Sequence, residues 1–106
     1  MIFENDIAAN TVMILRNNWS NGTIIVVDLR QLGLAHFYWA TDNEVQQRNV
    51  SPEYEIQPGE SVYVVADERK NIVILNKNDA AQHVCIEVDV NPVPPSFRPV
   101  SATSGF

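Results

Sequence analysis

The most regular pattern in the chain is the stretch Val84-Cys85-Ile86-Glu87-Val88-Asp89-Val90, in which branched apolar residues occupy every second position. Successive side chains of a β-strand point to opposite faces of a sheet, so this period of two predicts a strand with one buried face. Val84, Ile86, Val88 and Val90 are expected to point inward, and Cys85, Glu87 and Asp89 outward.

Shorter segments of the same kind precede this stretch and are separated by turn formers such as Asn21-Gly22 and Pro58-Gly59. The predicted strands cover residues 11–16, 23–29, 36–41, 53–56, 61–66, 72–75 and 84–90. Val and Ile dominate their apolar positions, which favours strands over helices. Short strands at this spacing predict an all-β fold, an antiparallel β-sandwich of the jelly-roll or immunoglobulin-like kind with about seven strands.

Four segments allow more specific predictions. Residues 23–29 are nearly all apolar, which is expected of a strand that is covered on both faces or lies centrally. Gln57-Pro58-Gly59-Glu60 has Pro and Gly where a type II turn requires them and is expected to join a pair of strands. The polar residues 42–52 are expected to form a long loop, and residues 79–82 fit either one helical turn or part of a strand.

The composition indicates one globular unit followed by an arm. The chain has 106 residues, of which 45% are hydrophobic and 19% charged, an ordinary globular balance. After residue 90 the prolines of 91–99 interrupt any regular ladder of backbone hydrogen bonds, so this segment is expected to extend as polyproline II. We therefore predict a β-sandwich domain over residues 1–90 and a Pro-rich, extended C-terminal arm over residues 91–106.

The charge of the chain bears on its partners and location. Its formal net charge is −6 and it has only two lysines, so it lacks the basic patch that binds nucleic acid or anionic membranes. Residues 1–6 carry acids where a signal peptide needs a basic and then an apolar region. No segment approaches the roughly 18 apolar residues that span a bilayer. We expect synthesis in the cytoplasm without a cleaved signal peptide.

No sequence motif for a nucleophile, a phosphate-binding loop or a zinc site is present. The residues His36, His83 and Cys85 could in principle bind a metal, and the spaced carboxylates of Glu53 with Glu55 and Glu87 with Asp89 could in principle catalyse glycoside hydrolysis. Ordinary outward-facing strand residues explain each set better. We predict no catalytic residue, no metal and no cofactor, and hence no enzyme.

The C-terminal arm is the first candidate for binding a partner. Its candidate residues are Pro92, Pro94, Pro95, Phe97, Arg98 and Phe106. The arm fits either a proline-rich ligand for an aromatic groove or an ordered extension that crosses a neighbouring subunit, with Phe106 as its apolar anchor. A tail without a partner is the third alternative.

The aromatic residues supply a second candidate site. Trp19, Tyr38 and Trp39 would suit a sugar-binding platform if their rings were exposed, because sugar CH groups stack on such rings. The alternative is that they belong to the core. From these observations we predict a non-enzymatic structural or interaction module that forms a homo-oligomer or a larger assembly, such as an accessory or decoration protein on a virus (phage) capsid. The alternative function is a carbohydrate-binding module.

Overall fold

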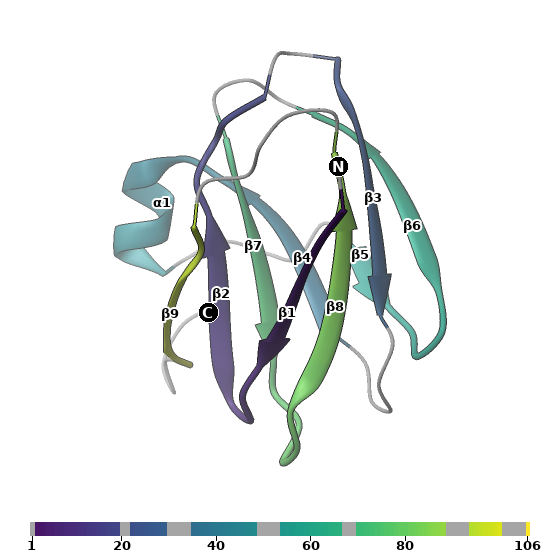
Figure 1. The fold of residues 1–106 in the computed structure, drawn as a ribbon. Coiled ribbons are helices and arrows are strands. Elements are labelled where there is room, and N and C mark those ends of the chain that lie inside the picture. Colours follow the sequence, from purple (N-terminus) through teal and green to yellow (C-terminus); the bar gives the residue numbers. More distant parts are fainter. Residues whose placement is uncertain are drawn as a thin grey trace.

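The chain forms two antiparallel β-sheets that pack face to face (Figure 1). The computed structural model describes residues 2–19, 22–29, 35–48, 54–66, 70–88, 94–100 and 106. Sheet A has the strand order β1 (Ile2–Ile7), β8 (Gln82–Glu87), β3 (Ile24–Leu29) and β6 (Ser61–Val65). Sheet B has the order β5 (Tyr54–Ile56), β4 (Ala35–Ala40), β7 (Asn71–Asn76), β2 (Thr11–Leu15) and β9 (Ser96–Pro99). The predicted all-β, two-sheet class is confirmed, with nine strands among the described residues because β1 and β9 were not expected.

The strands pair in a nested order. β1 pairs with β8, β2 with β7, β3 with β6 and β4 with β5, and every pair is antiparallel. The prediction of a strand pair around Pro58-Gly59 is wrong, although the turn itself forms: the N–H of Glu60 donates to the carbonyl of Gln57 at 3.0 Å, and Gly59 has φ +75°. This turn takes the chain from β5 in sheet B to β6 in sheet A, so the two strands have different partners.

The main core lies between the sheets. Val84, Ile86 and Val88 point into it, as the alternation predicted, whereas Asp89 and Val90 lie outside the described residues. Cys85 lies on the other side of β8, as expected, but is buried. The buried members of this core are Ile7, Met13, Leu15, Trp19, Ile25, Val27, Ala35, Phe37, Trp39, Ile56, Val64, Ala66, Ile72, Ile74, Val84, Ile86 and Val88.

A second apolar cluster lies on the outer face of sheet B. It consists of Val12, Ile14, Tyr38, Ala40, Val45, Val73, Leu75 and Phe106. Because this cluster covers the outer face, all six residues of β7 are buried. Helix α1 (Asp42–Gln47) contributes Val45 and lies on this side of the molecule, away from sheet A (Figure 1).

The helix corrects the prediction that residues 42–52 form a loop, at least for residues 42–47; residues 49–52 lie outside the described part. Thr41 caps its first turn: the N–H of Glu44 donates to Thr41 Oγ1 at 3.2 Å, and the N–H of Thr41 donates to Glu44 Oε1 at 3.0 Å. This reciprocal capping box satisfies two backbone N–H groups at the start of the helix, those of Thr41 and Glu44. At the other uncertain segment, residues 78–80 form bends and Gln82 begins β8, so neither a helical turn nor a strand covers all of 79–82.

The proline-rich segment also differs from the prediction. Ser96–Pro99 is a strand paired with β2, in the register Ile14 with Ser96 and Thr11 with Pro99, rather than a polyproline II segment without a ladder. The strand tolerates proline because β9 is at the edge of sheet B and Pro99 is its last residue. Residues 91–93 and 101–105 of the predicted arm lie outside the described residues.

Candidate interaction surface

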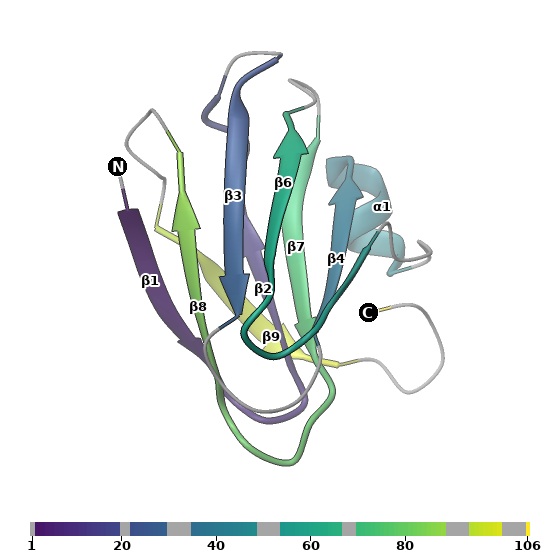
Figure 2. The same cartoon turned by 90° about the vertical axis from the view of Figure 1, so that its right-hand side faces the viewer.

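Strand β3 is open on the face that points away from the core. Ile25 and Val27 are buried in the main core, whereas Ile24 is 62% exposed and Val26 is half-buried. Of the two alternatives predicted for residues 23–29, coverage on both faces is wrong for the outer face, whereas a central position is confirmed, because β3 lies between β8 and β6. Figure 2 looks onto this face of sheet A, with β1, β8, β3 and β6 in front of sheet B and of α1.

The register of β3 and β6 gathers four apolar side chains on this open face. Ile24 lies opposite Val65, and Val26 lies opposite Tyr63. Tyr63 is 72% and Val65 67% exposed. Directly opposed residues of an antiparallel pair are close enough for their side chains to touch, so these four residues form one apolar patch. Contiguous exposed apolar surface of this kind is typical of a binding interface.

We call Ile24, Val26, Tyr63 and Val65 the apolar patch. It was not predicted as a site, although the sequence carried a signal for it. Both residues 23–29 and residues 61–66 have apolar residues at successive positions, which means that both faces of each strand are apolar. The missing information was that no described element covers the outer face of sheet A.

The other half of the same face is acidic. Exposed Glu4 and Asp6 of β1 flank His83 of β8: Asp6 Oδ1 lies 2.7 Å from His83 Nδ1, and Glu4 Oε2 lies 3.8 Å from His83 Nε2. Glu87 is exposed beside Ile2 in the next row. At the lower end of the patch, the Ser61 hydroxyl hydrogen-bonds to the Asp28 carboxylate. The outer face is thus divided between the apolar patch at the β6 edge and acidic side chains toward β1.

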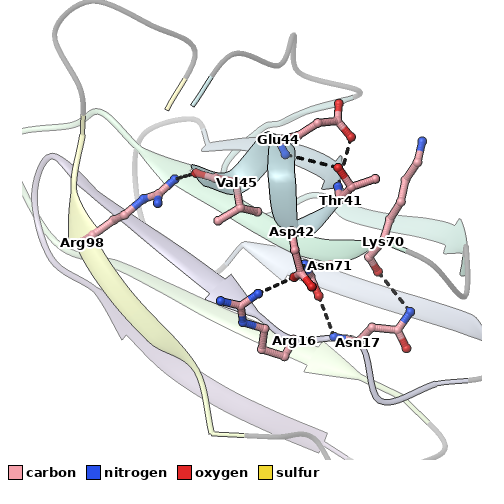
Figure 3. Close-up of polar contacts among 9 residues, drawn as sticks. All are labelled: Arg16, Asn17, Thr41, Asp42, Glu44, Val45, Lys70, Asn71 and Arg98. Atoms are coloured by element: carbon pink, nitrogen blue, oxygen red, sulfur yellow. Dashed lines mark hydrogen bonds and ion pairs between the residues drawn. The ribbon is translucent and has the colours of Figure 1, made fainter. Parts of the chain in front are cut away.

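The opposite face of the molecule is closed by polar contacts around α1 and β9 (Figure 3). A guanidinium N–H of Arg98 donates to the carbonyl of Val45, and Arg48 donates to the carbonyl of Pro99 at 3.1 Å. Burial lowers the pKa of Arg98, with the nearby charges of Arg48 and Arg16 as smaller causes. These contacts attach β9 to the end of the helix.

A second group of contacts fixes the start of the helix to the ends of β2 and β7 (Figure 3). Arg16 forms an ion pair with Asp42, and the side-chain amide of Asn71 donates to Asp42 Oδ1 at 2.8 Å. The Asn71 side-chain oxygen in turn accepts from the N–H of Asn17 at 2.9 Å. Asn71 is buried, so its hydrogen bonds offset the cost of burying its amide.

The predicted partner-binding residues of the arm are divided by the structure. Phe106 is fully buried against its own chain, with its ring centroid 4.8 Å from that of Tyr38 and 5.5 Å from the Arg98 guanidinium carbon. Pro94 and Phe97 are exposed, Pro95 is half-buried and Pro92 lies outside the described residues. The prediction that this segment binds a partner remains a prediction, and Phe106 would have to leave Tyr38 to take part.

The predicted sugar-binding residues are in the interior. Trp19, Tyr38 and Trp39 are 6%, 1% and 8% exposed. Trp39 packs edge-on against Trp19 and Phe37 in the main core, at centroid distances of 6.1 Å and 5.2 Å. Tyr38 belongs to the second cluster, where burial raises the pKa of its hydroxyl. The sugar-binding platform required exposed rings, and that requirement is not met by any of the three.

The candidate metal ligands are not brought together. His36 lies on β4 of sheet B and pairs with Glu55 at 3.7 Å, whereas His83 and Cys85 lie on β8 of sheet A. The described residues contain no group of three His, Cys, Asp or Glu side chains arranged to hold a metal ion. Of the two candidate carboxylate pairs, Glu53 and Asp89 lie outside the described part of the chain.

Comparisons with protein-family models, curated proteins and solved structures found no match to this chain. None of the helices within the described ranges is long and apolar enough to cross a membrane. Function is therefore inferred from the surfaces described above, of which the apolar patch is the most unusual for a protein that acts alone.

Proposed function

We propose that the chain is a non-enzymatic structural module that assembles with copies of itself, and that the apolar patch forms the contact between them. One observation carries this proposal: Ile24, Tyr63 and Val65 are each more than 60% exposed side by side on one face. Water exclusion from such a surface on association is favourable by roughly 25 cal/mol for each Å² of apolar area.

We further propose that the sandwich is a jelly roll rather than an immunoglobulin-like fold. In immunoglobulin domains the first two strands are neighbours in one sheet, whereas here β1 pairs with β8 and β2 with β7. Jelly rolls are found in viral capsid proteins and lectins. This supports the more specific proposal of an accessory or decoration protein on a virus capsid.

Carbohydrate binding receives no support from the three predicted rings, since Trp19, Tyr38 and Trp39 are all buried. The acidic half of sheet A agrees better with a protein partner than with a nucleic acid. The net charge of −6 would repel a phosphate backbone. Assembly through protein contacts is therefore the function that we put to a test.

The test is sedimentation velocity of the full chain from low micromolar to near-millimolar concentration. We expect reversible self-association in the wild type and a much weaker one in the double variant Ile24→Ser with Val65→Ser. The matched control, Ile2→Ser with Phe97→Ser, changes two exposed apolar residues outside the patch and should associate as the wild type does. A wild type that stays monomeric at every concentration would overturn the proposal.

A further inference from the structure

We infer that two copies of the chain pair through their β6 strands, antiparallel and about a two-fold axis at Tyr63, to form one continuous sheet of eight strands. The inference rests on the proposed function and specifies its contact. It predicts backbone hydrogen bonds between the two β6 strands, in addition to contact between the two apolar patches.

The four sheet edges differ in how well they are protected against such pairing. Natural proteins block exposed edges with charged side chains, proline or very short strands. β1 carries Glu4 and Asp6, β5 has only three residues, and β9 has four residues that include Arg98 and Pro99. β6, with the sequence Ser-Val-Tyr-Val-Val, has five residues without a charge or a proline. It is the one unprotected edge among the described strands.

The backbone of β6 has hydrogen-bonding groups available on its open side. Ala66, just after the strand, exchanges hydrogen bonds with the β3 side: its N–H donates to Thr23 at 2.7 Å and its carbonyl accepts from Gly22 at 3.0 Å. Residues of an antiparallel strand alternate in the side to which their N–H and C=O point. The N–H and C=O groups of Ser61, Tyr63 and Val65 therefore point away from β3.

Two-fold symmetry explains why a second copy fits this edge. In an isologous contact every residue meets its symmetry mate or the mate of a partner, so a charge near the axis would face the same charge. With the axis at Tyr63, Tyr63 meets itself, Ser61 meets Val65 and Val62 meets Val64, all of them uncharged. Side chains of the outer face then lie opposite outer-face side chains, which joins the two apolar patches.

The same geometry limits the assembly to a pair. Each copy has one unprotected edge among its described strands, and pairing uses that edge in both copies. The outer edges of the eight-stranded sheet are then the two β1 strands, where Glu4 and Asp6 oppose further addition. We therefore expect a dimer rather than a fibre through this contact.

The test is a charge swap at the axis, read by sedimentation velocity on the full chain. Tyr63→Lys and Tyr63→Glu should each weaken self-association by roughly tenfold or more, because like charges meet across the axis. An equimolar mixture of the two variants should recover association, since a lysine then faces a glutamate. Ile2→Lys and Ile2→Glu are the matched controls. Ile2 is 64% exposed on the same sheet, and neither change should alter self-association.

The outcomes separate this inference from the proposed function. A wild type that associates while both Tyr63 variants also associate, or while their mixture stays monomeric, would overturn pairing through β6 and leave assembly intact. If circular dichroism shows that the variants are unfolded, amide hydrogen exchange of the wild type tests the pairing through β6 instead. The Tyr63 and Val65 amides should be protected in the dimer and should exchange quickly after dilution to monomer; equal exchange in both states would contradict the inference.

Discussion

Trp39 lies at the centre of an aromatic cluster inside the sandwich, with Trp19 and Phe37 packed edge-on against it. Replacing Trp39 by Ala should lower the free energy of unfolding by about 3–5 kcal/mol, because it leaves a large cavity in the core. Tyr63→Ala, at an exposed position, should change it by less than about 0.5 kcal/mol. Urea unfolding of the dilute protein, followed by circular dichroism, measures both. Similar losses in the two variants would contradict the burial described here.

Glu44 gives a prediction for acid pH. Its pKa lies below the ordinary value of 4.5, chiefly because the carboxylate accepts the N–H of Thr41. The folded chain therefore holds this proton less tightly than the unfolded chain, and the stabilisation is complete above pH 4.5 and lost as the pH falls through the lowered pKa. At pH 7 the wild type should have a larger free energy of unfolding than Glu44→Gln, and the two values should converge in acid.

The matched control for Glu44→Gln is Gln46→Ala. It changes an exposed, uncharged residue of the same helix that takes no part in the capping box. It should leave the pH dependence of the wild type unchanged. Thr41→Ala removes the other half of the capping box and should cost about 1 kcal/mol. A pH dependence that is the same in Glu44→Gln and the wild type would show that the cap does not act through this carboxylate.

For individual residues, some features of the structure could be predicted from the sequence and others could not. The pattern Thr41-x-x-Glu44 is a capping box, but the polar residues that follow have only Val45 as an apolar contact, and a loop was predicted. The strand predicted at residues 36–41 implies that Phe37 and Trp39 lie on one face and Tyr38 on the other, and the two clusters agree with this. Which face was covered could not be predicted, because both faces are buried by elements distant in the sequence.

At the scale of elements, the C-terminal segment covers part of sheet B through Phe106. Phe106→Ala should lower the pKa of Tyr38 toward its ordinary value of 10.0, because burial is what raises it. Loss of the buried ring should also lower the free energy of unfolding by about 1.5–3 kcal/mol. Alkaline titration of tyrosinate absorbance measures the first effect. Phe97→Ala, on the same segment but 45% exposed, is the control and should leave the titration unchanged.

The raised pKa of Tyr38 also sets the sign of the effect of alkaline pH on stability. The folded chain holds the Tyr38 proton more tightly than the unfolded chain, so this contribution is present below pH 10 and is lost as the pH rises through the raised pKa. Stability should therefore decline at alkaline pH, and less so in Phe106→Ala. A Tyr38 titration that is indifferent to Phe106 would mean that the ring contact contributes little burial.

The strands themselves were largely predictable and their pairing was not. Short apolar segments bounded by turn formers located β2 to β8, because both signals are local in the sequence. The turn at Pro58-Gly59 was also predicted, yet a turn of this kind does not determine whether the next strand stays in the same sheet. β1 and β9 lacked the apolar alternation of the others, since both are edge strands with charged or proline residues.

At the scale of the whole molecule, the charge opposes the association that the apolar patch favours. Each copy carries a formal charge of −6, so copies repel one another at low ionic strength. Raising the salt from about 0.1 M to 1 M shortens the screening length from roughly 10 Å to 3 Å and should strengthen self-association. Sedimentation velocity in sodium chloride measures this. Association that weakens with salt would indicate an interface held by ion pairs instead of the patch.

The apolar patch can be recognised only when the register of the strands is known. Ile24 and Val65 are 41 positions apart in the sequence and lie opposite each other because β3 and β6 pair. The sequence indicated that each strand was apolar on both faces, but could not indicate that no described element covers the outer face of sheet A while described residues cover that of sheet B. That difference depends on where α1 and Phe106 pack.

The nested pairing of strands has a consequence for how the chain is made. Ile2 pairs with Glu87, so β1 has no β8 partner until residues 82–87 have left the ribosome. Folds dominated by such distant contacts form slowly, over roughly milliseconds to seconds. We expect the like charges of Glu4 and Asp6 to oppose pairing between the β1 strands of neighbouring nascent chains until β8 has been synthesised.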